Sequence, residues 1–165
     1  MKLILNIVLV YPQIPQNTGN IARTCAVTKT TLHLIKPLGF TLDDKYLKRA
    51  GLDYWDQLDI KIHESLDVFL YKYPREKMYL FTTKANSCYH EIDYDGDEYL
   101  IFGKESDGLS DNFIKNNFQR SLRIPMLNWA RSLNLANSVA IALYEAYRQL
   151  EFPDFKCRGD FLQEF

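Results

Sequence analysis

Short apolar runs that alternate with amphipathic segments are the feature that most constrains the fold of this chain. Residues 3–10 (LILNIVLV) are Leu, Ile or Val apart from Asn6. A strand of consecutive apolar residues is typical of a parallel sheet, whose strands are buried on both faces. Pro12 and Pro15 end this run. We therefore expect a central strand of a parallel sheet near the start of the sequence.

The rest of the chain repeats this alternation. Further strands are predicted at residues 32–35, 59–63, 78–81, 99–102 and 121–124, and helices over residues 19–28, 43–52, 65–73, 112–118 and 135–150. Thr18 and Asn134 are the expected N-caps of the first and last helices. This order predicts an α/β fold with a mostly parallel sheet. A length of 165 residues fits one domain, which we place at residues 1–155, with a C-terminal tail at residues 156–165.

The composition excludes several classes of protein. The apolar start resembles a secretory signal, but the run is short, Asn6 interrupts it and no small-residue cleavage site follows. No apolar stretch approaches the ~20 residues that span a bilayer. The candidate metal ligands are Cys25, Cys88, Cys157, His33, His63 and His90. Their spacing matches no metal motif, so we expect a cytoplasmic protein with reduced cysteines and no metal.

Three segments combine polar residues with strand or helix ends. Residues 15–23 (PQNTGNIAR) follow the first strand, and Asn20 and Arg23 share one helix face, where an amide and a guanidinium could bind phosphate or ribose. Residues 102–109 (FGKESDGL) contain Gly103, which leaves room for a ligand to approach the backbone. Residues 124–138 (IPMLNWARSLNLANS) place polar groups beside a helix N-terminus, which suits a polar ligand. Ordinary helix caps, a solvated arginine and a plain strand-to-helix turn explain the same patterns.

A basic cluster lies in the second predicted helix. Lys45, Lys48 and Arg49 fall on one helix face and could meet a phosphate backbone, although a solvated face explains them as well. The net charge of −1 means that any binding to nucleic acid depends on a local patch.

Taken in order, these segments resemble the SPOUT superfamily of RNA 2′-O-methyltransferases, and within it the small TrmL-like (YibK-like) type that lacks an added RNA-binding domain. The resemblance covers residues 3–153 and includes residues 43–45 (DDK), 49–54 (RAGLDY), 82–84 (TTK) and 144–146 (YEA). It implies a parallel α/β sheet whose C-terminal segment threads through a loop as a trefoil knot. The residues alone would not predict a knot, because knots are nearly absent from proteins.

The resemblance also implies a function. Members of this family form homodimers, with the active site near the interface, and bind S-adenosylmethionine in the knotted loops. By motif, Phe81, Gly103, Ile124 and Ser132 would bind the cofactor. The implied reaction methylates the ribose 2′-hydroxyl of the wobble nucleotide, cytidine or uridine, in the tRNA anticodon loop.

The catalytic residues implied in this way are Arg23, Asn20 and Tyr144. A guanidinium stays protonated in proteins, so we expect Arg23 to stabilise developing negative charge rather than to accept a proton. The expected substrate-binding residues are Lys45, Lys48, Arg49, Arg131 and Asn134, and Glu105 is expected to order its loop.

The chain departs from the family in the second motif, which often reads Gly-Pro-Glu-x-Arg-Gly in close relatives. Here Lys104 replaces the proline and Asp107 replaces the arginine. Two alternatives remain open at this point. One is a 2′-O-methyltransferase that acts on another RNA, such as rRNA, and the other is a non-catalytic RNA-binding protein. Retention of Asn20, Arg23 and Gly103 argues against the second.

Overall fold

The chain folds around a seven-stranded sheet in which every pair of neighbouring strands is parallel. The computed structural model describes residues 3–43, 45, 49 and 52–159. The sheet order is β3-β2-β1-β6-β4-β7-β5. The strands are β1 (Asn6–Val10), β2 (Thr31–Ile35), β3 (Ile60–His63), β4 (Met78–Phe81), β5 (Ser87–Cys88), β6 (Tyr99–Phe102) and β7 (Ser121–Arg123). The α/β fold with a parallel sheet is thus confirmed.

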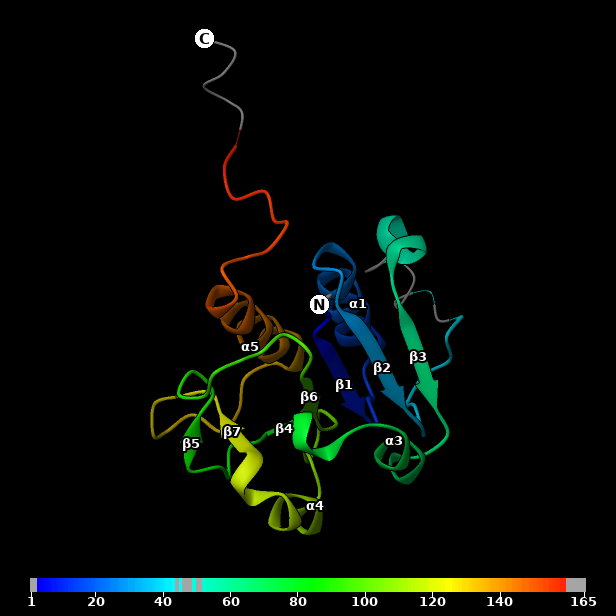
Figure 1. Ribbon diagram of the computed structural model, residues 1–165. Helices are drawn as coiled ribbons and strands as arrows, with labels where there is room; N and C mark the ends of the chain where they lie inside the picture. Colours follow the sequence, from blue (N-terminus) through cyan, green and yellow to red (C-terminus); the bar gives the residue numbers. More distant parts are fainter. Residues whose placement is uncertain (1–2, 44, 46–48, 50–51, 160–165) are drawn as a thin grey trace.

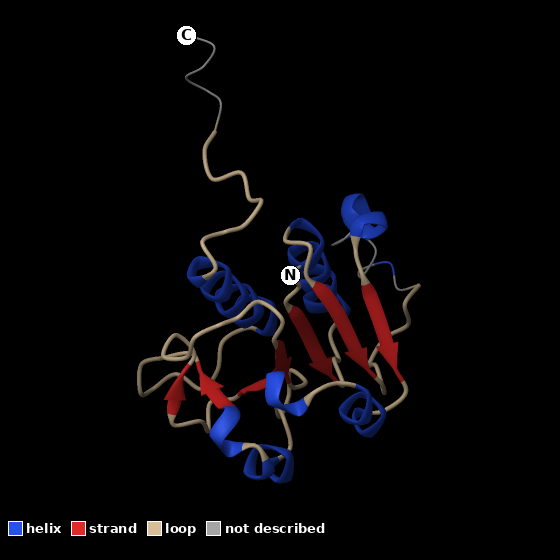
Figure 2. Cartoon of the chain, in the orientation of Figure 1, coloured by secondary structure: helices blue, strands red, loops and turns tan. Residues whose placement is uncertain are grey.

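Helices cover both faces of this sheet (Figures 1 and 2). The helices α1 (Pro15–Val27) and α5 (Leu135–Gln149) pack against each other and share one hydrophobic core with alternate residues of the strands. The helices α3 (Leu66–Lys72) and α4 (Asp111–Asn116) contribute Phe69 and Ile114 to a second core on the opposite face. Short 3₁₀ helices lie at η1 (Leu52–Gln57), η2 (Arg75–Lys77) and η3 (Phe118–Arg120). Burial on both sides explains why the inner strands β1, β2, β4 and β6 are mostly apolar.

Two local predictions differ from the structure, and a third lies largely outside the described residues. Thr18 is not an N-cap: α1 begins at Pro15, a position that suits proline because its missing N–H would be unpaired there, and Thr18 is buried within the helix. The strand β5 was not expected, because its two residues form no apolar run. The helix predicted over residues 43–52 falls largely outside the described residues, and Leu52 instead opens η1.

The N-cap predicted at Asn134 is confirmed. The side chain of Asn134 caps α5 by accepting hydrogen bonds from the N–H groups of Ala136 and Asn137, at 2.9 and 3.3 Å. Ser65 caps α3 by accepting from the N–H of Val68. Among the described helices, none is both long and apolar enough to cross a membrane.

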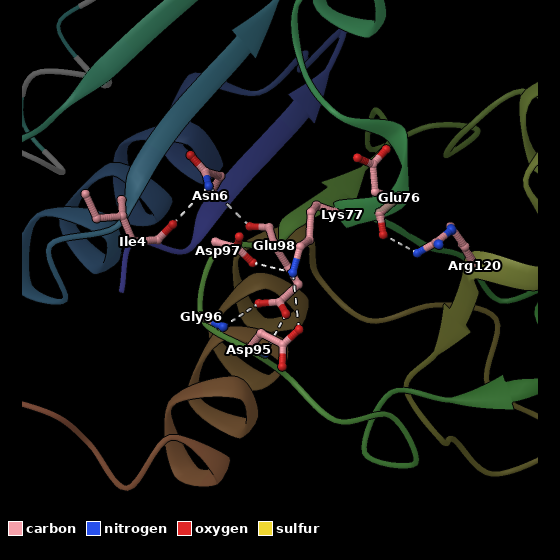
Figure 3. Close-up of polar contacts among 9 residues, drawn as sticks. All are labelled: Ile4, Asn6, Glu76, Lys77, Asp95, Gly96, Asp97, Glu98 and Arg120. Atoms are coloured by element: carbon pink, nitrogen blue, oxygen red, sulfur yellow. Dashed lines mark hydrogen bonds and ion pairs between the residues drawn. The ribbon is translucent and has the colours of Figure 1, made fainter. Parts of the chain in front are cut away.

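A polar cluster holds the end of the sheet where β1, β4 and β6 begin (Figure 3). The buried carboxylate of Glu98 accepts hydrogen bonds from the N–H groups of Asp95 and Gly96, at 2.5 and 2.9 Å. Lys77 forms ion pairs with Asp95 and Asp97, at 3.2 and 2.9 Å. These contacts fix the turn that leads into β6. The cluster lies at the end of the sheet where the strands begin, whereas ligands of open α/β folds bind at the opposite end, where the strands finish.

Two histidines that are distant in sequence form a buried pair. His33 Nε2 lies 3.1 Å from Asn6 Oδ1, and His33 Nδ1 lies 3.0 Å from His63 Nε2. The Asn6 amide group donates to the carbonyls of Ile4 and Glu98, so its oxygen accepts from His33 Nε2–H. His33 Nδ1 then accepts from His63, which requires a neutral His33. Burial, together with the nearby His63 and lysines, lowers the pKa of His33 to about 3.

Acid should therefore destabilise the fold. In the unfolded chain His33 binds a proton near pH 6.5, whereas the folded chain resists protonation down to about pH 3. The free energy of unfolding should fall by about 1.4 kcal/mol per pH unit below pH 6.5 for this one group. Urea unfolding of wild type and His33→Gln at pH 7, 6 and 5 should show a shallower pH dependence in the variant. The matched control is His90→Gln at an exposed position, and equal slopes in His33→Gln and wild type would contradict the expectation.

Candidate active site

A cavity of about 580 Å³ opens at the edge of the sheet where β4, β6 and β7 end. Its walls are three loops that follow these strands and the first turn of α1. The carboxyl ends of parallel strands share one edge of the sheet, and ligands of open α/β folds bind there. The volume is within the usual range for a small-molecule site.

The four predicted cofactor-binding residues all line this cavity: Phe81, Gly103, Ile124 and Ser132. They come from three segments of the chain that lie far apart in sequence. The rings of Phe81 and Phe102 stack with centroids 4.6 Å apart and form an apolar wall. Thr82 and Asn17 add polar groups to the rim.

Gly103 is required by its own loop. A Cβ at this position would lie 2.1 Å from the carbonyl carbon of Gly108 and 2.3 Å from the nitrogen of Leu109. The loop folds back on itself because the N–H of Gly108 donates to the carbonyl of Lys104, at 2.9 Å. The space that a side chain at position 103 would occupy is therefore filled by protein backbone, so a glycine is needed for the fold of this loop, while Gly103 itself lines the cavity.

The two departures from the family motif form an ion pair. Lys104 Nζ lies 2.7 Å from Asp107 Oδ2, and this contact holds the pKa of the Asp107 carboxyl below its usual value. The cavity also contains Lys84, which follows β4 and pairs with Asp111 of α4. Lys84 lies in the segment 82–84, which is part of the family resemblance, but it is not among the predicted site residues. Its position just after a strand, at the same edge of the sheet, is the signal that could have identified it.

Glu105 connects the second motif to the first. Its carboxylate accepts hydrogen bonds from the N–H groups of Gln13 and Ile14, at 2.8 and 3.1 Å, and from the side-chain amide of Asn17, at 3.3 Å. A carboxylate beside a helix N-terminus is stabilised by the helix dipole. Glu105 thus holds its loop against the start of α1.

The same network reaches the third motif. The amide group of Asn134 donates to the side-chain oxygen of Asn17, at 3.0 Å, while the Asn134 oxygen caps α5. Asn17 thus contacts both Glu105 and Asn134. The three polar segments that looked independent in the sequence are hydrogen-bonded to one another around one cavity.

The three predicted catalytic residues lie outside the cavity. Asn20, Arg23 and Tyr144 are exposed, and none of them lines its wall. Arg23 is six residues beyond Asn17, about 9 Å along the helix axis, and its guanidinium lies 4.9 Å from the ring centroid of Tyr54 in η1. Tyr144 is 44% exposed on α5. Within one chain, these residues therefore do not meet the predicted cofactor site.

The predicted substrate-binding residues separate into two groups. Arg131 and Asn134 line the cavity, whereas Lys45 and Arg49 are exposed elsewhere. Lys48 lies outside the described residues, so the shared helix face predicted for this cluster has no structural description.

The geometry suits a bound organic cofactor that has both a flat apolar part and polar groups. Among the residues that the structure describes, no group of three or more His, Cys, Asp or Glu side chains could hold a metal ion. The aromatic wall, amides, hydroxyls and backbone groups that line one cavity fit such a cofactor.

Comparisons with known proteins agree with this description. The profile of the SpoU rRNA Methylase family matches residues 4–144. A protein of Bacillus subtilis (strain 168) is 50% identical over 155 residues, which cover 92% of this chain and 97% of that protein. The chain is also 46% identical to a protein of Saccharophagus degradans that is named tRNA (cytidine(34)-2′-O)-methyltransferase. The aligned residues cover 92% of this chain and 99% of that protein. A solved structure described as giving structural insights into the 2-OH methylation of C/U34 on tRNA is 46% identical, with a TM-score of 0.85, and covers 90% of this chain and 97% of that one.

Proposed function

Because the chain belongs to the SpoU rRNA Methylase family, we propose that it is an enzyme that methylates the ribose 2′-hydroxyl of the wobble nucleotide, cytidine or uridine, in a tRNA anticodon loop. The observation that carries this proposal is the 46% identity, over nearly the whole of both chains, to the structure concerned with 2-OH methylation of C/U34 on tRNA. We further propose that the enzyme acts in the cytoplasm, because its proposed substrate is a tRNA.

The proposed cofactor is S-adenosylmethionine, held in the cavity by Phe81, Gly103, Ile124 and Ser132. When bound, it supplies a methyl group on a positively charged sulfur. The stacked Phe81 and Phe102 rings and the side chain of Ile124 offer the apolar contact that adenine needs. Glu105 and Asn134 keep the surrounding loops in place through their contacts with α1. We place the family's trefoil knot at these loops, with the C-terminal segment threaded beside residues 103–109.

The exposed positions of Asn20, Arg23 and Tyr144 support a homodimer. The outer face of α1 presents Asn20 and Arg23, and the outer face of α5 presents Ile141 and Tyr144. Since the two helices pack together on one side of the sheet, these faces form one surface. In the dimer that we propose, this surface meets a second copy, and Arg23 of one subunit reaches the cavity of the other.

As the 2′-hydroxyl loses its proton, negative charge develops on the oxygen that accepts the methyl group. The Arg23 guanidinium remains charged and stabilises that oxygen and the adjacent phosphate, while solvent water takes the proton. Asn20, one turn earlier on α1, orients Arg23 or the ribose. Alignment of hydroxyl and methyl supplies much of the acceleration, since oriented reactants reach effective molarities of about 10⁵ M or more.

The proposed function predicts that methyl transfer depends on one oxygen atom. Anticodon stem-loops carrying ribose at the wobble position should accept methyl groups from radiolabelled S-adenosylmethionine, whereas 2′-deoxyribose at that position should abolish the transfer. A matched control carries deoxyribose at the neighbouring nucleotide and should remain a substrate. Equal methylation of both wobble substrates would refute the 2′-O assignment. Methylation of rRNA fragments but of neither stem-loop would move the target to rRNA, as the family description allows.

A further inference from the structure

The loop between β7 and α5 contributes residues to two hollows of the surface. One side lines the cavity through Met126, Arg131 and Leu133. The other side forms a shallow apolar groove, which we call the Trp129 groove. Its lining residues are Pro125, Met126, Leu127, Trp129, Ala130 and Leu133. Because Met126 and Leu133 line both, the groove and the proposed cofactor cavity share a wall.

Trp129 stands at the tip of a tight turn. The N–H of Ala130 donates to the carbonyl of Leu127, at 2.9 Å, which places Asn128 and Trp129 at the two central positions. The Trp129 side chain is 81% exposed and that of Leu127 is 69% exposed. No described residue stacks on the indole ring or hydrogen-bonds to it. Trp129, Leu127 and Leu133 together expose an apolar patch beside the cavity, and contiguous patches of this kind are typical of interaction sites.

The charge beside the groove indicates what occupies it. Lys84 and Lys104 line the cavity, but each is paired with an aspartate. Arg131 is exposed and forms no ion pair with any carboxylate among the described residues. Its guanidinium is therefore available to an anion. An open aromatic face two residues from an open guanidinium suits a nucleotide, whose base stacks and whose phosphate pairs.

A protein partner fits this surface less well. A stable protein interface buries about 1,200 Å² or more in total, whereas the Trp129 groove comes from one short loop. The acceptor hydroxyl must also approach to about 3–3.5 Å of the transferred methyl group. The target nucleotide therefore lies at the mouth of the cavity, within reach of this groove.

We propose that Trp129 is a substrate-binding residue that stacks on a base of the RNA substrate, while Arg131 binds an adjacent phosphate. This inference rests on the proposed function, and it adds a residue that contacts the base rather than the ribose. Stacking of a base on an aromatic side chain contributes about 1–3 kcal/mol, so its loss should weaken RNA binding about tenfold or more.

A double-mutant cycle between protein and RNA tests this assignment. Affinities of wild type and Trp129→Ala are measured for an anticodon stem-loop and for versions with one abasic nucleotide at each loop position. At the loop position whose base stacks on Trp129, removal of the base should weaken RNA binding by wild type about tenfold. The same removal should change RNA binding by Trp129→Ala little, because the stacking contact is already lost. Trp129→Phe should restore most of the affinity. S-adenosylmethionine affinity, measured by calorimetry, should stay unchanged in both variants.

The control is Tyr71→Ala, which removes a 95% exposed aromatic side chain on α3, away from the cavity. This change should leave RNA binding unaltered. Additive losses at every loop position, or equal losses for Trp129→Ala and Tyr71→Ala, would overturn the proposal. A lower mass of Trp129→Ala by light scattering would instead assign the groove to a second copy of the chain. If wild type methylates a different RNA, the same cycle on that RNA tests Trp129 separately, and wild type that methylates no RNA overturns the proposed function itself.

Discussion

Gly103→Ala is expected to abolish S-adenosylmethionine binding while the sheet stays folded. The added methyl would lie 2.1 Å from the backbone of Gly108, so residues 104–109 must move as a unit. Overpacking of this kind costs about 1–3 kcal/mol even where side chains can adjust, and here the obstacle is backbone. The Gly103→Ala affinity measured by calorimetry should therefore fall about 100-fold or more.

Two measurements separate loss of the site from loss of the fold. Circular dichroism should show the secondary structure of Gly103→Ala unchanged, because β6 ends before the displaced loop. Gly159→Ala is the matched control, since a Cβ there meets nothing within 4 Å and should leave binding unaltered. Wild-type affinity in Gly103→Ala would show that the 104–109 loop does not form the cofactor site.

The sequence predicted β1, β2, β4 and β6 well because these inner strands are largely buried and are mostly apolar, whereas the edge strand β5 was missed because its two residues form no apolar run. β4 and β6 have the predicted limits, and β7 ends one residue early. The order of the strands in the sheet could not be predicted, because an apolar run does not show which other strand it pairs with. The same limit hid the pair of His33 and His63, which come together only because β2 and β3 are adjacent.

The sequence predicted several residues that line the cavity but not how they are connected. The rule that ligands bind where parallel strands end applies to Phe81, Gly103 and Ile124, which follow or close β4, β6 and β7. No such rule shows that Asn17 hydrogen-bonds to both Glu105 and Asn134, because these contacts join segments about 90 to 120 residues apart. Nor does a motif reveal that Arg23 does not line the cavity of its own chain.

Replacing Arg23 by alanine is expected to lower kcat about 100-fold or more, because it removes the charge that stabilises the developing 2′-oxyanion. The fold should survive, since Arg23 is exposed and its described ring contact, with Tyr54, contributes about 0.5–1 kcal/mol at most. Cofactor affinity should stay near that of wild type, as Arg23 does not line the cavity. Arg23→Lys should restore little activity, because an ammonium cannot reproduce the planar guanidinium. Single-turnover methyl transfer to the ribose stem-loop measures each effect, and near-normal rates in Arg23→Ala would remove this residue from the reaction.

Subunit mixing then decides whether Arg23 acts within its own chain or across the proposed dimer. Arg23→Ala retains an intact cavity, and Gly103→Ala retains an intact arginine, so each homodimer alone should be inactive. If Arg23 acts across the interface, the co-expressed heterodimer contains one site with a wild-type cavity and a wild-type Arg23 from the other subunit. That heterodimer should recover up to about half of the wild-type rate, because one site of the two is complete. If Arg23 acts within its own chain, neither site is complete and no activity returns. The exposed position of Arg23, about two helical turns beyond the cavity wall, favours the first outcome.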